Sequence, residues 1–178
     1  MIFCDTSRTF NIIQPASSKF GGWSFVSPRL VPVAIKQVMV AVDGSDHSMK
    51  AAELGIRLAK LWNAQLYFIH VQEKDKIPSW FTKFAETEHI GKGDYFEIVE
   101  ERLFGPLFAR AKESEIQVFS GIRARGDAAD QILRNVERKK ADLIVMGNRG
   151  LSKFSRVILG SVSTKVLSKA KCTCITVK

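Results

Sequence analysis

The feature that most constrains the fold is a regular alternation of short apolar runs and longer amphipathic stretches, which begins near Lys36. The apolar runs are continuous, as in strands that are buried on both faces of a sheet. Strands that alternate with helices are joined by right-handed crossovers, which place helices on both faces of a parallel sheet. The pattern therefore predicts a three-layer α/β domain. Its expected strands are residues 38–42, 65–71, 116–122, 143–146 and 172–177.

The stretches between these runs carry apolar residues at helical spacing. In the first stretch Ala51, Leu58 and Trp62 belong to one stripe, which predicts a helix packed on the sheet. In the second stretch, Gly105-Pro106 should kink or split the helix, because proline removes a backbone donor. The expected helices run from about Asp46 to Trp62, from Asp94 to Glu113, from Asp127 through Val136 and from Gly160 to about Ala170.

The charge of the chain lies mostly at its two ends. The chain has 27 basic and 18 acidic residues, a formal net charge of +9. Residues 37–142 carry 16 basic and 17 acidic side chains, whereas residues 143–178 carry seven basic side chains and no acidic one. A nucleic-acid-binding module is therefore not expected, since it would need a basic face over the domain itself. No apolar stretch approaches the roughly 20 residues of a membrane span, so we expect a soluble protein.

Three cysteines are too few for a disulfide framework. Cys172 and Cys174 are two residues apart, with no second pair that would complete a zinc site, so core or interface packing is expected for them. His70 falls in a predicted buried strand and is expected to be a core histidine with its hydrogen bonds satisfied.

Residues 1–35 show no strand or helix periodicity, and we expect a disordered leader, a start site assigned too early, or an organellar transit peptide. The domain is expected over residues 36–178. Its expected location is the cytoplasm, with organellar import as the alternative if the leader is a transit peptide. Residues 72–92 are expected to form a long loop, in which Trp80, Phe81 and Phe84 make either a lid or a local hydrophobic cluster.

A glycine-rich segment follows the fourth predicted strand. Gly147-Asn148-Arg149-Gly150 is followed after nine residues by Gly160-Ser161, at the start of the last helix. Glycines let backbone N–H groups approach an anion, and a helix N-terminus offers unpaired donors, so this segment predicts a phosphate site. Neither G-x-x-x-x-G-K-[ST] nor G-x-G-x-x-G is present, which argues against a P-loop and a Rossmann site.

The segment GNRGLSKFSRVILGSVS, together with VAVDGSDHS after the first strand, resembles the nucleotide-binding branch of the universal stress protein family. The resemblance covers residues 36 to 178 and implies a flavodoxin-like sheet, similar to adenine nucleotide alpha hydrolases, with strand order 3-2-1-4-5. It implies ATP or AMP as the ligand, with or without Mg²⁺. The implied contact residues are Ala41, Val42, Asp43, Val71, Met146, Gly147, Arg149, Gly150, Gly160, Ser161, Val162 and Ser163. Lys153 and Arg156 are weaker candidates for phosphate contact.

The resemblance further implies a homodimer through the C-terminal strand. Thr173 stands at a position where the family often has proline. We expect a nucleotide-binding regulatory protein with an unknown protein partner and at most slow ATP hydrolysis, since no nucleophile with a neighbouring base is apparent. The alternative is a dimeric interaction module that leaves the nucleotide site unused. An ATP-pyrophosphatase is a poor match, since VDGSDHS lacks the required S-G-G-x-D-S loop.

Overall fold

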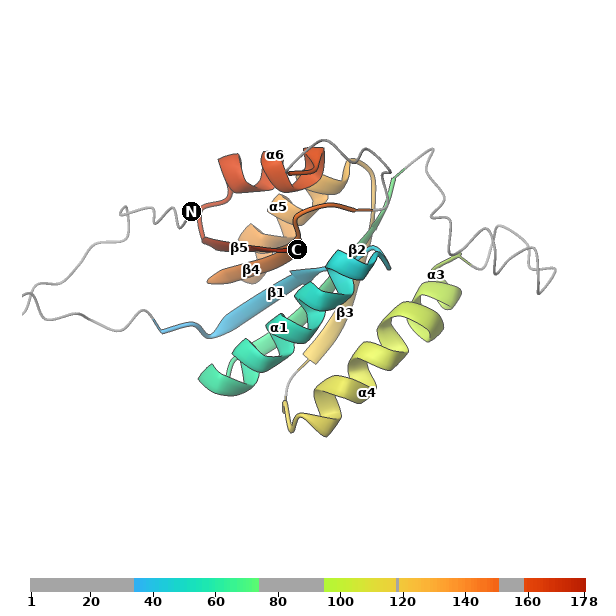
Figure 1. The fold of residues 1–178 in the computed structure, drawn as a ribbon, viewed down its shortest axis with the longest axis vertical. Helices are drawn as coiled ribbons and strands as arrows, with labels where there is room; N and C mark the ends of the chain where they lie inside the picture. Colours follow the sequence, from blue (N-terminus) through green and yellow to red (C-terminus); the bar gives the residue numbers. More distant parts are fainter. Residues whose placement is uncertain (1–33, 74–94, 118, 151–158) are drawn as a thin grey trace, which may run out of the picture.

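The fold is built on one five-stranded parallel sheet. The computed structural model describes residues 34–73, 95–117, 119–150 and 159–178. The strands lie in the order β3-β2-β1-β4-β5, and all neighbouring pairs are parallel (Figure 1). The expected α/β fold and strand order are confirmed. The strands are β1 (Gln37–Ala41), β2 (Gln65–Gln72), β3 (Phe119–Arg125), β4 (Leu143–Gly147) and β5 (Thr173–Val177).

Helices cover both faces of the sheet. In Figure 1, α1 and α4 lie on one face, and α5 and α6 lie on the other. The chain therefore crosses to the other face of the sheet after β3. As a result, the neighbouring strands β1 and β4 are followed by helices on opposite faces, α1 after β1 and α6 after β4. The helical segments are α1 (Asp46–Trp62), α3 (Tyr95–Ile98), the π-helix η2 (Val99–Phe104), α4 (Gly105–Glu113), α5 (Ala128–Lys139) and α6 (Ser161–Lys169).

The central strand β1 explains the continuous apolar runs of the sequence. Val38 and Val40 are fully buried in the core beneath α1 and α4, whereas Met39 is fully buried in the core beneath α5 and α6. Because alternate residues of a strand point to opposite faces, a sheet covered on both sides requires apolar residues at every position of its central strand.

The helix α1 approaches β1 closely through Gly55. A Cβ atom at position 55 would collide with Cγ2 of Val40. Trp62, which we expected on the packed stripe, is 41% exposed. The expectation for Trp62 is wrong because it is the last residue of α1, beside the amino-terminal ends of β1 and β2, where the sheet no longer covers it.

The segment around Gly105-Pro106 is divided, as expected. The π-helix η2 ends there, α4 begins at Gly105, and the Gly105 N–H donates to Glu100 C=O, five residues earlier. Pro106 has no N–H and its ring crowds the carbonyl four residues before it, and the wider π-turn accommodates this.

The third strand begins later than the sequence pattern suggests. We expected residues 116–122, but β3 is Phe119–Arg125. Ile116 is buried, yet it belongs to the turn after α4, where its N–H donates to Ala111 C=O at 3.1 Å. The apolar run therefore combined a helix-capping residue with the beginning of the strand.

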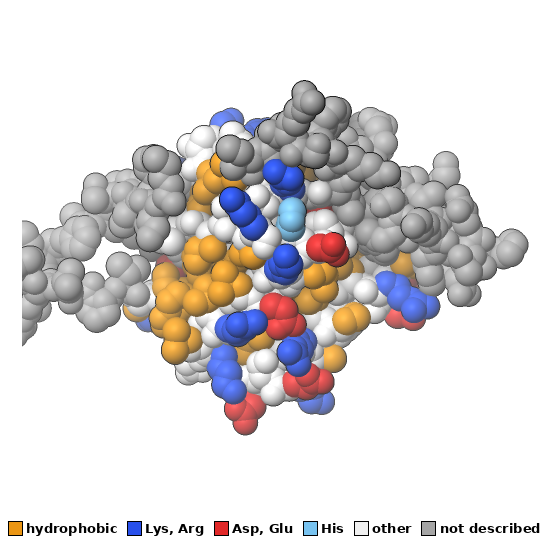
Figure 2. Space-filling view, viewed as in Figure 1, with side chains coloured by type: hydrophobic (Ala, Val, Ile, Leu, Met, Phe, Trp, Pro, Cys, Tyr) orange, Lys and Arg blue, Asp and Glu red, His pale blue; other side chains and the backbone are white. Residues whose placement is uncertain are grey.

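The outer surface of α1 is mixed in charge. Figure 2 shows basic and acidic side chains interspersed over this helix, with hydrophobic side chains gathered toward the edge of the sheet that contains β5. Leu54 and Leu58 of α1 and Ile175 and Val177 of β5 are half-buried and pack against the core beneath α1 and α4.

Candidate functional site

The candidate site lies where the carboxyl ends of β1 and β4 meet. Ala41 pairs with Met146 near the ends of these strands. Ligands of open α/β sheets bind at such a point, where the connections leave to opposite faces. The residues that converge there are Asp43, Gly147, Gly150 and Gly160, and we call them the β1/β4 site.

A tight turn after β1 fixes the carboxylate of Asp43. Gly44 has a φ of 82°, a conformation that suits glycine. Asp43 Oδ1 accepts hydrogen bonds from the backbone N–H (2.9 Å) and the hydroxyl (2.6 Å) of Ser45. The Ser45 hydroxyl in turn accepts from the Ser48 N–H at 3.3 Å and caps α1. The turn thus anchors Asp43 to the beginning of α1.

The glycine-rich segment lies directly against this turn. A Cβ atom at position 150 would lie 2.6 Å from Oδ2 of Asp43. A Cβ atom at position 147 would lie 2.9 Å from the Arg149 carbonyl oxygen and 3.0 Å from the backbone carbon of His47. Residues about a hundred positions apart in the sequence are therefore in close contact, and the glycines make that contact possible.

The peptide groups of Asn148 tie the glycine segment to α6 and to β5. Asn148 is 4% exposed. Its N–H donates to Val177 C=O at 2.8 Å, and its C=O accepts from the Gly160 N–H at 2.7 Å and from the Ser163 hydroxyl at 3.0 Å. Sequence reasoning gave Asn148 no role. The only signal was its place as a polar residue directly after a buried strand.

The N-terminus of α6 begins at Gly160 without a side-chain cap. The Ser163 hydroxyl is committed to the carbonyl oxygens of Asn148 and Gly160, and its side chain is buried. Ser161 is exposed and Val162 is half-buried. The first turn of a helix has N–H groups without intrahelical acceptors, so the backbone of residues 161–163 supplies the donors here.

Val71 directs its peptide groups past the end of β1. Neighbouring peptide groups in a strand alternate between its two sides. Ile69 C=O accepts from the Val42 N–H on the β1 side, whereas Gln72 C=O accepts from the Gly126 N–H on the β3 side. Val71 therefore points its backbone to the same side as Ile69, beyond Ala41↔Ile69, the last register pair of β1 and β2.

His70 is a buried, hydrogen-bonded core residue, as expected. It is 1% exposed, with Nδ1 2.8 Å from Val42 O and Nε2 2.7 Å from the Tyr95 hydroxyl. Because a carbonyl oxygen only accepts, Nδ1 carries the hydrogen and Nε2 accepts from Tyr95. Burial lowers the pKa of His70 despite the opposing effects of the Val42 bond and the Asp43 charge, and burial raises the pKa of Tyr95 to about 12.

Acidification should destabilise the fold through His70. Its pKa is lower in the folded chain than in the unfolded one, so the unfolded state binds more protons below about pH 6.5. The free energy of unfolding should fall there by up to about 1.4 kcal/mol per pH unit. Urea unfolding at several pH values should show a smaller drop for His70→Gln than for the wild type. Equal slopes in the two proteins would exclude this role of His70.

The other expected site residues lie around the β1/β4 site with their side chains in the core. Ala41, Met146 and Val162 belong to the core beneath α5 and α6 or pack against it, and Val42 is buried in the core beneath α1. Arg149 is half-buried, and its Nε has no hydrogen-bond partner. The candidates outside the described residues are Lys153, Arg156, Trp80, Phe81 and Phe84.

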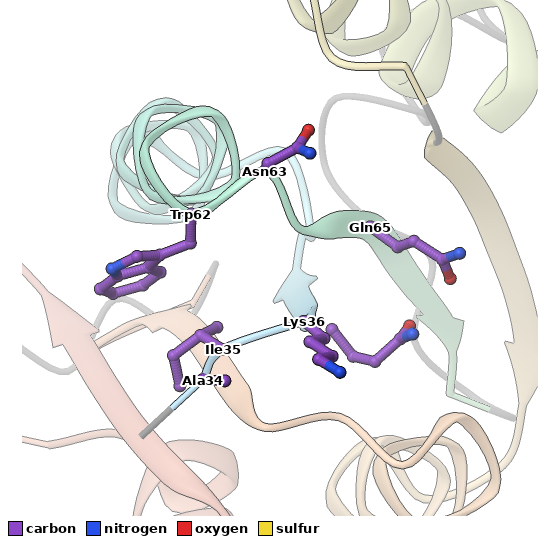
Figure 3. Close-up of a pocket in the computed structure, with 7 residues that line it drawn as sticks. Ala34, Ile35, Lys36, Trp62, Asn63 and Gln65 are labelled. Atoms are coloured by element: carbon purple, nitrogen blue, oxygen red, sulfur yellow. The ribbon is translucent and has the colours of Figure 1, made fainter. Parts of the chain in front are cut away.

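A separate cavity of about 560 Å³ lies at the amino-terminal ends of the strands, opposite the ends that carry the β1/β4 site. Figure 3 shows the Trp62 ring near Ile35 and Ala34, whereas Asn63 and Gln65 point away from it. The walls come from the amino-terminal ends of β1 and β2 and the end of α1. This cavity is therefore distinct from the β1/β4 site.

The part of the chain that the structure describes contains neither a candidate metal cluster nor a candidate membrane-spanning helix. Among those residues no group of three or more His, Cys, Asp or Glu side chains could hold a metal ion. No helix within the same residues is long and apolar enough to cross a membrane.

The fold and the β1/β4 site define a class of protein: an α/β domain with a five-stranded parallel sheet, similar to adenine nucleotide alpha hydrolases. A model of the universal stress protein family matches residues 34–178. The chain belongs to the universal stress protein family. It is 34% identical to the universal stress protein YxiE of Bacillus subtilis over 146 residues, which cover 80% of this chain and 98% of that protein.

Solved structures show the same fold. The universal stress protein UspA from Lactobacillus plantarum matches with a TM-score of 0.67 and 19% identity, covering 81% of this chain and 98% of that one. A universal stress protein in complex with cAMP matches with a TM-score of 0.57 and 26% identity, covering 81% and 97%. The universal stress protein from Archaeoglobus fulgidus in complex with dAMP matches with a TM-score of 0.56 and 20% identity, covering 82% and 99%.

Proposed function

We propose that this chain binds an adenine nucleotide, ATP or AMP, at the β1/β4 site and acts as a regulatory stress-response factor. The observation that carries the proposal is the close contact between the glycine segment and the turn that holds Asp43. This contact brings a fixed carboxylate, closely packed glycine backbone and a helix N-terminus together at the carboxyl ends of β1 and β4.

The N-terminus of α6 is the proposed phosphate-binding element. The Gly160 N–H is already committed to Asn148, so the donors for a phosphate are the backbone N–H groups of the first turn, helped by the Ser161 hydroxyl. That turn contains no acidic residue, so its positive dipole end is not offset by its own side chains. Arg149 adds a cation within the glycine segment.

Asp43 and Val71 are the proposed contacts of the adenosine. A carboxylate accepts hydrogen bonds from ribose hydroxyls, and Asp43 Oδ2 faces Gly150, on the glycine side of the site. The Val71 peptide, directed past the end of β1, offers one donor and one acceptor to the adenine edge. Mg²⁺ would be held mainly by the phosphates of the nucleotide.

The known relatives support a nucleotide of this class. Two solved universal stress proteins are complexes with adenine nucleotides, cAMP and dAMP. The expected activity is binding, with at most slow ATP hydrolysis, because the sequence offers no nucleophile with a neighbouring base at the site.

Isothermal titration of the full chain with ATP, AMP and GTP, each with and without Mg²⁺, tests the proposal. We expect saturable binding of one adenine nucleotide per chain and weaker binding of GTP. Absence of heat at millimolar nucleotide would reject the proposal and favour an interaction module that leaves the site unused.

We also propose that β5 is a dimer edge. Thr173 N–H donates toward β4 and Val177 C=O accepts on that same side, so the peptide groups of Cys174 and Thr176 face outward. Half-buried Ile175 and Val177 add apolar surface beside this edge. Sedimentation velocity should give a dimer, and a monomer at all concentrations would contradict the proposal.

A further inference from the structure

The peptide group between Val42 and Asp43 is held by side chains. It follows Ala41, the last residue of β1 in register with β2 and β4. The Val42 C=O accepts a hydrogen bond from Nδ1 of His70 at 2.8 Å. The Asp43 N–H donates to the hydroxyl oxygen of Ser48 at 3.3 Å. One side chain from β2 and one from α1 therefore pair both polar groups of this peptide.

The two side chains that hold this peptide are buried and have further hydrogen bonds. His70 is 1% exposed and Ser48 is 3% exposed. The Tyr95 hydroxyl donates to Nε2 of His70 at 2.7 Å. The Ser48 hydroxyl donates to Ser45 C=O at 2.9 Å. Because the imidazole is bonded at both nitrogens, it cannot turn over or exchange its tautomer without breaking a buried hydrogen bond.

This peptide contributes to the position of the Asp43 carboxylate. The peptide fixes the backbone directly before the Asp43 Cα, while Ser45 holds Oδ1 through its N–H and its hydroxyl. The backbone and one carboxylate oxygen are thus both held, with Oδ2 toward Gly150. A group that is fixed before the ligand arrives binds more tightly, because less conformational freedom is lost on binding.

We propose that His70 is a positioning residue of the nucleotide site, which holds the Val42–Asp43 peptide so that Asp43 accepts hydrogen bonds from the ribose hydroxyls. This inference rests on the proposed function, since it assigns Asp43 to the ribose. His70 acts through the peptide and does not touch the ligand. Burial lowers the pKa of His70, which favours the neutral ring that both of its hydrogen bonds require.

The inference predicts a loss that is confined to one part of the ligand. In His70→Leu the Val42 C=O would be a buried acceptor without its donor, so the peptide would turn away from its present orientation. Asp43 would then lose its alignment with the ribose. The proposed phosphate donors belong to the first turn of α6 and do not depend on this peptide, so the contribution of the phosphates should persist.

Isothermal titration of the full chain with ATP and with 2′,3′-dideoxy-ATP tests the inference. The quantity compared is the dissociation constant of dideoxy-ATP divided by that of ATP. This ratio should be at least about 20-fold for the wild type, because hydrogen bonds to a carboxylate are lost, and below about threefold for His70→Leu. An unfolded fraction raises both constants by the same factor and cancels in the ratio, so a merely structural role of His70 would not change it.

His70→Asn is the conservative variant. Its amide nitrogen takes the place of Nδ1 and again donates to Val42, but it loses the link to Tyr95. Tyr95→Phe leaves the ring with one hydrogen bond and carries the test if His70→Leu does not fold. The ratio should be about 5- to 10-fold for both. The matched control is Tyr67→Phe, which removes a hydroxyl that donates to Gln65 at 2.8 Å in the same strand and should keep the wild-type ratio.

The outcomes separate this inference from the proposed function. A wild type that binds no nucleotide rejects both. The inference alone is overturned if the wild type binds ATP and dideoxy-ATP equally, if His70→Leu keeps the wild-type ratio, or if His70→Asn gives a ratio no higher than His70→Leu. Equal ratios for Tyr95→Phe and Tyr67→Phe would also overturn it.

Discussion

Gly147→Val should lower the affinity for ATP by at least about 100-fold, equivalent to about 2.7 kcal/mol. A Cβ atom at this position would lie 2.9 Å from the Arg149 carbonyl oxygen and 3.0 Å from both the backbone carbon and Cβ of His47. Two of these atoms belong to the backbone and cannot rotate away. The glycine segment or the beginning of α1 would therefore have to move, and the β1/β4 site would open. Isothermal titration with ATP measures the loss.

The matched control for this variant is Gly105→Ala, at a glycine outside the β1/β4 site. A Cβ atom at position 105 would have its nearest contact at 3.5 Å, to the Glu100 carbonyl oxygen, and the backbone φ of −51° suits alanine. Nucleotide affinity should change by no more than about threefold, or about 0.7 kcal/mol. Urea unfolding of both variants separates loss of the site from loss of the fold. A folded Gly147→Val protein that binds ATP like the wild type would place nucleotide binding elsewhere.

Gly55→Val should lower the free energy of unfolding by about 2–3 kcal/mol, the upper range for overpacking of a core. The added side chain would collide with Val40, which is itself fully buried in the central strand. Valine is a better helix former than glycine, but the gain is only a few tenths of a kcal/mol and does not offset the collision. Urea unfolding at neutral pH gives the difference directly.

A double-mutant cycle identifies the collision as the cause. Val40→Ala alone should be destabilising because it leaves a cavity, yet in combination with Gly55→Val it makes room for the new side chain. The two effects should therefore depart from additivity by more than about 1 kcal/mol. Gly105→Ala is the control for glycine replacement within a helix, since its nearest contact would be 3.5 Å away and its effect should be small. Additive effects would exclude a direct clash between positions 55 and 40.

The sequence predicted those parts of the fold that depend on local pattern. Continuous apolar runs identified β1 and β4 because both faces of these strands are covered, and the Gly105-Pro106 pair located the division of the second helical stretch. The error at β3 arose because a capping residue, Ile116, is as buried as a strand residue and extends the apolar run. Burial and secondary structure are distinct properties, and a sequence pattern reports mainly the first.

The candidate site was predictable in its residue types but not in its internal bonds. Glycines after β4 and an aspartate after β1 indicate a ligand site because of where these residues stand in an α/β pattern. The commitment of the Ser163 hydroxyl and the bridging role of Asn148 depend on contacts between distant segments, which no local pattern contains. For the same reason the side chain of Met146 proved to be a core residue whose position, rather than chemistry, places it near the site.

The bridging peptides of Asn148 have a thermodynamic consequence. The Asn148 N–H donates to Val177, the last residue of the edge strand, and its C=O accepts from Gly160 and Ser163 at the beginning of α6, so hydrogen bonds connect the two regions through one residue. A ligand that moves α6 would disturb the hydrogen bonds that lead through Asn148 to β5. An assembly that holds β5 in place would restrain α6 through the same bonds. For the proposed nucleotide and the proposed dimer, linkage makes the two effects equal in free energy: the factor by which nucleotide would change dimer affinity is the factor by which dimerisation would change nucleotide affinity.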